Sequence, residues 1–294
     1  NIELKSATKV FEMYGIYSDR ATEQGTIKTI YNAYYDNSTD ISEGKGRGNI
    51  TVKSLATGGG KTNVYGIYAK DGIVYNAYTS NEEADVVGTI SVEAIGGMQG
   101  GEVVGIYGEG ANSKIYNSGY NSIINVKSTG NGATGKADAY GMKGIKSTIA
   151  NEGKINVEMT STSNKNNAVG IYVEEGVATN HIDATITVSG HNNTYGMFAN
   201  VKAGNSDDAI ILNDGVVNVS GDGNNFGIFA NIENGSNGTI NVENNGTINI
   251  NGEQINSRSL SAPSRVMSFL YKSRNSSFLV ILFVSSDFSF QAFL

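Results

Sequence analysis

A four-residue phrase recurs seven times along the first 229 residues of the chain. It places an aromatic residue or Val first, Gly second, Ile or Met third, and an aromatic residue or Lys fourth. The copies are Tyr14–Tyr17, Tyr65–Tyr68, Val104–Tyr107, Tyr140–Lys143, Val169–Tyr172, Tyr195–Phe198 and Phe226–Phe229. A unit of about 30 residues repeated this often is typical of solenoid architectures, in which like units stack on one another.

Two further phrases alternate with this glycine phrase. One has the form of "TISV", with Ile or Val at every second position, and its copies span 49–52, 89–92, 123–126, 154–157, 185–188, 216–219 and 239–242. The other places Asn two positions after an apolar residue, as in "IYNAY" at 30–34 and "VYNAY" at 74–78. Alternating β-branched and aromatic residues bordered by Gly, Asn or Asp predict a short β-strand for each phrase.

The phrases also predict which side chains are buried, because successive strand residues point to opposite faces. In the "TISV"-type phrases the aliphatic residues, such as Ile90 and Val92, should be buried and the intervening Ser, Thr and Asn exposed. In the glycine phrase the first and third residues are always apolar. Since the fourth position accepts Lys143, we expect that position to face outward together with the glycine.

Three short strands cannot bury their own apolar faces, so each unit must stack on its neighbours. Coiling the chain so that each phrase lies on its predecessor produces an all-β parallel β-helix of about seven coils with three short strands per coil. Stretches without a pattern, such as 36–48, then become corner loops, where insertions contact only solvent. A propeller, which needs four strands per blade and a more regular period, is the less favoured alternative.

The composition limits the chemistry that the chain can carry. The 294 residues include no Cys and bear a formal net charge of −7. Disulfides and thiolate metal sites are therefore excluded, and the acidic balance argues against a nucleic-acid partner. Gly58–Thr62 ("GGGKT") resembles a phosphate loop, but position 55 is Leu where such a loop needs its first Gly, and a strand phrase follows instead of a helix. We expect no nucleotide and no other cofactor.

Candidate catalytic groups are sparse. The two histidines, His181 and His191, are not accompanied by a nucleophile motif. Three acidic pairs lie in polar stretches between strand phrases: Glu82-Glu83, Glu174-Glu175 and Asp207-Asp208. Enzymes that cleave polysaccharides use such carboxylates, but the different distances of these pairs from the glycine phrase indicate that they do not converge. We expect no catalytic residue, no metal site and no enzymatic activity.

The fourth residues of the glycine phrases predict an aromatic column on the outside of the coils. Its members are Tyr17, Tyr68, Tyr107, Tyr172, Phe198 and Phe229, interrupted by Lys143. Rings stacked about 5 Å apart stabilise a ladder through offset contacts, and this structural role is the simpler interpretation. An exposed aromatic strip would also suit a sugar face or a partner surface, so the column is the candidate binding site.

The composition changes abruptly after residue 252. All 38 glycines lie in 1–252, whereas 253–294 contain none and include the single Pro of the chain. We therefore divide the chain into a repeat domain, 1–252, and an aberrant tail, 253–294. Loss of the repeat together with a gain of Ser, Phe and Arg favours a frame shift or a misread gene end over an adapted cap or a lone barrel strand ending in Phe293-Leu294. We expect poor order in the tail.

The repeats resemble the passenger repeats of bacterial autotransporters. The resemblance rests on "GTINVENNGTINING" at 238–252, on the Tyr-Gly-Ile-Tyr-Ala phrase at 65–69 and on their alternation, and it covers 1–252. It implies a right-handed β-helix that is exported, displayed through a C-terminal outer-membrane β-barrel of the full-length protein or secreted, and often adhesive or toxic.

From the repeats and this resemblance we expect a surface-exposed or secreted stalk at the bacterial cell surface or outer membrane. Its expected role is adhesion to a host-cell receptor or glycan, without catalysis of its own. The competing class is a β-helical polysaccharide-degrading enzyme, a lyase or glycosidase. Acidic pairs clustered in one cleft would favour the enzyme, and a flat wall with an aromatic column would favour the adhesin.

Overall fold

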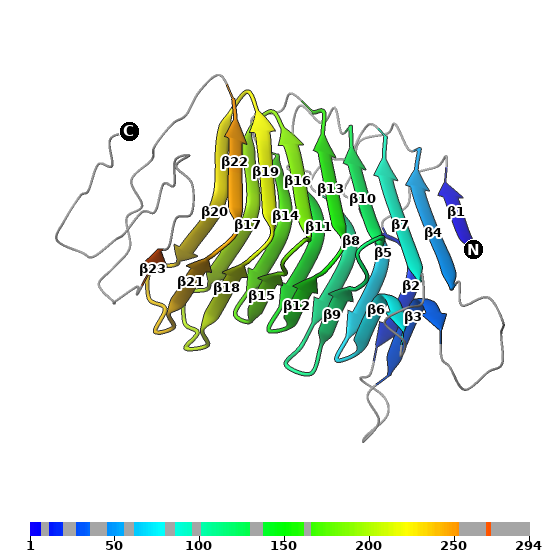
Figure 1. The fold of residues 1–294 in the computed structure, drawn as a ribbon, viewed down its shortest axis with the longest axis horizontal. Coiled ribbons are helices and arrows are strands. Elements are labelled where there is room, and N and C mark those ends of the chain that lie inside the picture. The colour runs from blue at the N-terminus through cyan, green and yellow to red at the C-terminus, as the bar shows by residue number, and fades with distance from the viewer. Residues whose placement is uncertain are drawn as a thin grey trace.

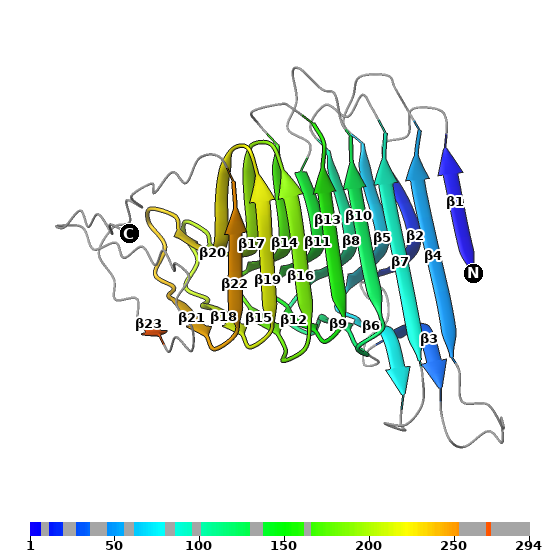
Figure 2. The ribbon, with the colours of Figure 1, turned by 45° about the horizontal axis from the view of Figure 1, so that its top comes forward.

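The computed structural model describes residues 1–6, 12–19, 28–35, 46–55, 62–79, 86–95, 101–129, 138–161, 166–252 and 269–271. Every regular element among these residues is a β-strand, and the strands wind into an elongated right-handed parallel β-helix (Figure 1). Each coil contributes one strand to each of three sheets, which confirms the predicted solenoid of about seven coils with three strands per coil. The sheets run side by side along the rod (Figure 2).

Sheet A contains the "TISV"-type phrases. Its strands, in spatial order, are β1 (Ile2–Ser6), β4 (Arg47–Ser54), β7 (Val87–Ala94), β10 (Ile123–Ser128), β13 (Lys154–Met159), β16 (Thr185–Gly190), β19 (Val216–Gly221) and β22 (Thr247–Asn251). Neighbouring strands run parallel with equivalent residues paired, so Ile90 lies beside Ile124 and Ile124 beside Ile155. Like positions of the repeat therefore stack on one another, as the sequence predicts.

Sheets B and C contain the other two phrases. Sheet B holds the seven glycine phrases in β2 (Glu12–Asp19), β5 (Asn63–Lys70), β8 (Glu102–Glu109), β11 (Asp138–Ile145), β14 (Asn167–Glu174), β17 (Asn193–Val201) and β20 (Asn224–Ile232). Sheet C holds β3 (Thr29–Tyr35), β6 (Ile73–Thr79), β9 (Lys114–Asn117), β12 (Thr148–Asn151), β15 (Val177–Asn180), β18 (Ala209–Asn213), β21 (Ile240–Asn244) and β23 (Phe269–Tyr271). Within each coil the chain passes through sheets A, B and C in that order.

The prediction that residues 239–242 belong with the "TISV"-type strands is wrong. They fall in β21, which pairs with β18 in sheet C, and the next phrase forms β22 in sheet A. The reason is the winding order, because a chain that leaves sheet B must cross sheet C before it returns to sheet A. The predicted corner loop 36–48 also ends early, since β4 begins at Arg47, and 36–45 lie outside the described residues.

The interior is one continuous aliphatic core. Ile50, Ile90, Ile124, Ile155 and Ile186 of sheet A are at most 1 % exposed and form a single column. The third residues of the glycine phrases and the aliphatic residues of sheet C join the same cluster. Burying each of these Ile or Val side chains stabilises the fold by about 1.5–3 kcal/mol, so the aliphatic columns hold the three sheets together.

The glycine of the phrase faces inward, contrary to the prediction, and the first residue faces outward. Ile67 lies in the aliphatic core, whereas Tyr65, two residues earlier, lies in a separate outer cluster with Tyr107. Residues two apart in a regular strand share a face, so the alternation breaks at Gly66. A Cβ on Gly66 would lie 2.5 Å from Ile90 Cγ2 and 2.5 Å from the Gly105 carbonyl oxygen. Only Gly fits where the strand kinks towards the core.

We expect Gly141→Ala to lower the free energy of unfolding by about 1–3 kcal/mol or more, because its Cβ would lie 2.2 Å from Ile155 Cγ2 and 2.6 Å from the Gly170 carbonyl oxygen. Urea unfolding followed by circular dichroism measures the loss. Gly72→Ala is the matched control, since the nearest atom to its Cβ is the Lys28 carbonyl oxygen at 3.3 Å. Equal stability of the Gly141 variant and the wild type would refute the inward orientation.

A buried asparagine ladder closes the corner between sheets C and A. Each side-chain amide nitrogen donates to the side-chain oxygen of the Asn one coil further on, at 2.6–2.9 Å, through Asn32, Asn76, Asn117, Asn151, Asn180, Asn213 and Asn244. The second amide hydrogen reaches main-chain carbonyl oxygens at the corner, as from Asn151 to Gly153 at 3.2 Å. Five of the ladder residues are at most 1 % exposed, so the recurring Asn of the third phrase is a structural requirement.

We expect Asn151→Ala to cost about 1–3 kcal/mol of unfolding free energy, because it leaves the buried Asn117 donor and Asn180 acceptor without partners. Asn244→Ala should cost less, since Asn244 is the last member of the ladder and is only partly buried. Thermal unfolding of the two variants provides the comparison. A larger loss at Asn244 would contradict the ladder as a cooperative element.

Of the predicted tail, 253–294, the structure describes only Phe269–Tyr271, which form β23 beside β21. The remaining positions, and with them the expectation of poor order, lie outside the described residues.

Candidate functional site

The outer face of sheet B carries two neighbouring columns of mostly aromatic residues, which we call the aromatic strip. The column predicted from the fourth residues of the phrase contains Tyr17, Tyr68, Tyr107, Lys143, Tyr172, Phe198 and Phe229. The second column comes from the first residues: Tyr14, Tyr65, Val104, Tyr140, Val169, Tyr195 and Phe226. The predicted column therefore exists, but it is half of a wider surface. The alternation of faces breaks at the glycine and turns the first residue of the phrase outward. For this reason the second column was not predicted from the sequence.

Ring contacts hold the strip together in both directions. Along the coils, Tyr68 and Tyr107 stack with centroids 4.8 Å apart and planes 10° apart, and Tyr195 stacks on Phe226 at 5.0 Å. Across the columns the rings meet edge to face, as between Tyr65 and Tyr68 at 5.5 Å and 79°. Such pairs contribute about 0.5–1.5 kcal/mol each beyond area burial, so the strip stabilises the stack.

Acidic side chains along both edges of the strip accept hydrogen bonds from its tyrosines. The pairs are Tyr14–Glu12, Tyr17–Asp19, Tyr65–Glu102, Tyr68–Glu109, Tyr140–Asp138 and Tyr172–Glu174, at 2.6–3.3 Å. In the last coils the rings become Phe and the edges become amide ladders instead, such as Asn193–Asn224 at 2.9 Å and Asn200–Asn231 at 2.7 Å. Acidic acceptors at the edges are thus replaced by amides in the coils where most of the rings are Phe and have no hydroxyl.

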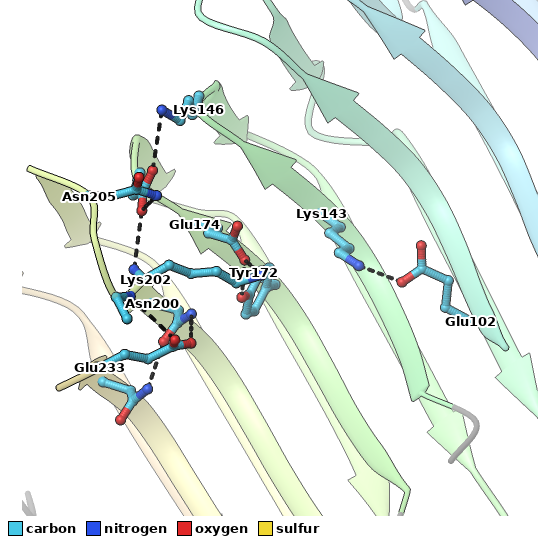
Figure 3. A network of polar contacts seen from close by, with 12 residues as sticks. Glu102, Lys143, Lys146, Tyr172, Glu174, Asn200, Lys202, Asn205 and Glu233 are labelled. Atoms are coloured by element: carbon cyan, nitrogen blue, oxygen red, sulfur yellow. Dashed lines mark hydrogen bonds and ion pairs between the residues drawn. The ribbon is translucent and has the colours of Figure 1, made fainter. Parts of the chain in front are cut away.

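Lys143 replaces a ring in the predicted column without leaving the strip. Its Nζ lies 4.8 Å from the Tyr140 centroid and 5.5 Å from that of Tyr107, and it forms an ion pair with Glu102 (Figure 3). A cation over ring faces is attracted by their π electrons, so the lysine joins the rings of Tyr107, Tyr140 and Tyr172. Its outward position, predicted from the sequence, is confirmed.

Exposure is uneven among the predicted site residues. Tyr107 and Tyr172 are only 7 % and 9 % exposed, because neighbouring rings lie on one side and beside them and Lys143 lies on the other side. Tyr17 in the first coil is 53 % exposed, and Tyr68, Phe198 and Phe229 are half-buried. A partner of the strip would therefore contact chiefly these four rings.

A second aromatic surface, the tyrosine cluster, lies on the outer face of sheet C near the N-terminal end. Its members are Tyr31, Tyr34, Tyr75, Tyr78 and Tyr116. Parallel stacking joins Tyr31 to Tyr75 at 5.5 Å and Tyr75 to Tyr116 at 4.9 Å. Sequence reasoning missed this surface, although the repeated "YNAY" at 31–34 and 75–78 was its signal.

The acidic pairs are closer together than the sequence indicates. Lys146 Nζ lies 2.9 Å from Asp207 Oδ2 and 3.6 Å from Glu175 Oε2, so the interpretation that the pairs lie apart is wrong for these two (Figure 3). Glu175 is buried at the corner between sheets B and C, where it accepts hydrogen bonds from Asn205 Nδ2 and the Lys202 amide. These carboxylates thus fasten a corner loop. Glu82-Glu83 lie outside the described residues.

A shallow groove of about 440 Å³ crosses the outer face of sheet A. Glu93, Lys127 and Glu158 line it, with Asn125 and Asn156 beside them. Lys127 Nζ is 2.9 Å from Glu158 Oε1, and Glu93 pairs in the same way with Lys53 at 2.6 Å. The charges of the groove are therefore already matched within the sheet.

The glycine-rich segment and the histidines are the other candidates from the sequence. The strand β5 follows "GGGKT" directly, as predicted, and 56–61 lie outside the described residues. His191 Nδ1 lies 2.7 Å from Asp222 Oδ2 on the exposed surface, one coil apart. Within the described ranges, no three His, Asp or Glu residues are grouped so that they could hold a metal ion. A bilayer-spanning helix is likewise absent from the described part of the chain.

Comparison with known proteins finds no family model, no curated protein and no solved structure that matches the chain. The site is therefore interpreted from its own chemistry.

The buried tyrosines predict a loss of stability at alkaline pH. Burial raises the pKa of Tyr195 to about 12, and it raises those of Tyr65, Tyr107 and Tyr172 further. The folded chain thus keeps protons that the unfolded chain loses near pH 10, so stability is full below pH 10 and falls as the pH rises. Each buried tyrosine contributes up to about 1.4 kcal/mol per pH unit. Urea unfolding at pH 9 and pH 11 tests this, and Tyr195→Phe should reduce the slope. A pH-independent midpoint would contradict it.

Proposed function

We propose that this chain is a surface-exposed or secreted β-helical stalk of an autotransporter, that it is adhesive, and that it has no catalytic role. The observation that supports this most is the aromatic strip, which continues over all seven coils of sheet B. Exposed aromatic surface on a soluble fold is a common mark of an interaction site. A rod built by stacking like coils also suits a stalk, because length is added without changing the core.

The chemistry of the strip favours a partner with an apolar surface. Six of the eight tyrosine hydroxyls in the two columns already donate to carboxylates of the same chain, for example Tyr68 to Glu109 at 2.8 Å. The strip therefore presents ring carbon more than free hydrogen-bond donors. We propose that it contacts a receptor protein on a host cell through Tyr17, Tyr68, Phe198 and Phe229, while Tyr107 and Tyr172 hold those rings in place.

Display follows from the resemblance of the repeats to autotransporter passengers. In this proposal the chain lies at the bacterial cell surface or outer membrane, or is released from it. The outer-membrane β-barrel of the full-length protein is its partner within that assembly.

The alternative function is a polysaccharide-degrading enzyme, and the groove on sheet A is the observation that favours it. Glu93 and Glu158 line the same groove, as a pair of catalytic carboxylates would. Each of them is, however, ion-paired with a lysine, which favours a structural role. Release of reducing ends from a panel of polysaccharides, lost in Glu158→Gln, would establish the enzyme in place of the stalk.

The adhesive role is tested by binding of the purified, fluorescently labelled chain to cultured host cells. We expect the combined variant Tyr17→Ser, Tyr68→Ser, Phe198→Ser and Phe229→Ser to bind at least tenfold more weakly, because these rings supply the accessible apolar area. Circular dichroism should stay β-rich, since none of the four is fully buried. Thr187→Ala with Asn218→Ala, on the outer face of sheet A, is the matched control. Absence of binding by the wild type, or equal binding by the strip variant, contradicts the proposal.

A further inference from the structure

The tyrosine cluster on sheet C differs from the aromatic strip in its exposure. Tyr31 and Tyr34 are 41 % and 48 % exposed, and the other three members are half-buried. In the strip, by contrast, Tyr65 is 5 % exposed. The cluster therefore exposes ring faces of the kind that, at Tyr65 in the strip, are covered by neighbouring rings.

The hydroxyl groups of the cluster differ as well. Among the residues that the structure describes, the hydroxyls of Tyr31, Tyr75, Tyr78 and Tyr116 have no hydrogen-bond partner, whereas six tyrosines of the strip donate to carboxylates. Burial, and to a smaller extent the nearby Glu152 carboxylate, raises the pKa of Tyr75 and Tyr116, so both hydroxyls remain protonated donors at neutral pH. The cluster thus combines exposed rings with several hydroxyls that can bond to a ligand.

One of the ring columns of the cluster ends at Tyr116. The position that follows Tyr116 one coil further on is Ala150, so the stack of Tyr31, Tyr75 and Tyr116 ends there. In the part of the chain that the structure describes, no ring contacts Tyr116 other than that of Tyr75, so its face towards Ala150 has no stacking partner there. Between the columns the rings are inclined to one another, as for Tyr75 and Tyr78 at 65°. A flat ring-shaped ligand can pack on this uncovered, inclined ring surface. A continuous stack, in which every ring face is already covered, would leave it no such place.

Among the described residues, one positive and one negative side chain lie beside the cluster. Lys114 is exposed on the same strand and face as Tyr116, and the partly buried Glu152 lies near Tyr75 and Tyr116. Within the described ranges these are one lysine and one carboxylate, which give a strongly charged ligand little advantage, and the net charge of −7 opposes polyanions. A ligand with apolar ring faces and many neutral hydroxyl groups fits the rings and the free donors together.

We propose that the tyrosine cluster binds a neutral, extended, β-linked oligosaccharide. The apolar faces of the sugar rings pack on the tyrosine rings, the tyrosine hydroxyls donate to sugar oxygens, and Glu152 and Lys114 bond to sugar hydroxyls at the rim. In such a chain successive sugars advance by a length comparable to the coil spacing of about 4.8 Å, so neighbouring sugars meet equivalent tyrosines. This site is independent of the receptor contact proposed for the strip.

Calorimetric titration with pentamers of β-1,4-linked glucose and of β-1,4-linked N-acetylglucosamine tests the proposal. We expect at least one pentamer to bind the wild type, and Tyr75→Ser combined with Tyr78→Ser to weaken binding by more than tenfold. Tyr75→Phe keeps the ring and removes one donor, so a loss of about fivefold is expected. Because this variant preserves the stack, it also provides a test if the double variant does not fold.

The matched control is Tyr17→Ser combined with Tyr68→Ser, which removes two tyrosines from the strip and should leave the affinity for the pentamers unchanged. No heat from either pentamer, or equal affinity for the wild type and both cluster variants, overturns the proposal. Cell binding that depends on Tyr75 and Tyr78 but survives enzymatic removal of cell-surface glycans also overturns it, in favour of a protein partner. Loss of cell binding in the strip variant, with glycan binding intact, separates the two sites.

Discussion

The parallel, in-register pairing of each strand with its equivalent one coil away is the constraint on which the structure depends. It places every side chain directly between two copies of its own position in the repeat. Aliphatic residues then form continuous columns, and amides form hydrogen-bonded ladders such as Asn117–Asn151–Asn180. Charges are tolerated where their sign alternates, as in Lys53–Glu93 and Lys127–Glu158 on sheet A. A side chain therefore suits this fold if it can pack against the same type of side chain, or a complementary one, at the equivalent position of the next coil.

The same pairing links the exterior to the core. Aromatic rings stack at the coil spacing, and acidic side chains along the edges of sheet B accept hydrogen bonds from six of the tyrosine hydroxyls. Most of the tyrosine rings on that sheet are covered by their neighbours. On sheet C the cluster around Tyr75 and Tyr116 has no such edge among the described residues, and its rings remain accessible. Accessibility, more than aromatic content, separates rings that can meet a partner, such as Tyr17 in the strip and Tyr34 in the cluster, from rings that only support the stack.

Much of the fold, and part of the site, could be read from the repeat. The alternation in "TISV" correctly placed Ile90, Ile124 and Ile155 in one buried column. The same rule failed at Gly66, because a strand that kinks at glycine no longer alternates, and so Tyr65 was assigned to the wrong face. It also failed at 239–242, where two similar phrases occupy different sheets because the winding order decides between them. The exposed tyrosines Tyr31 and Tyr34 were not predicted, because the Asn of the third phrase indicates a strand but not which neighbouring side chains face outward.

The sequence by itself determined the class of fold, the number of coils and the aliphatic core of sheet A, because periodic burial is a local property that repeats along the chain. It also determined that an aromatic column would exist. Only the tertiary structure decided which rings are covered, which hydroxyls have partners, and which acids meet at Lys146. Those properties depend on residues one coil away, and the corner loops that separate the coils in sequence vary in length. A spacing along the chain therefore does not reveal which side chains become neighbours in space.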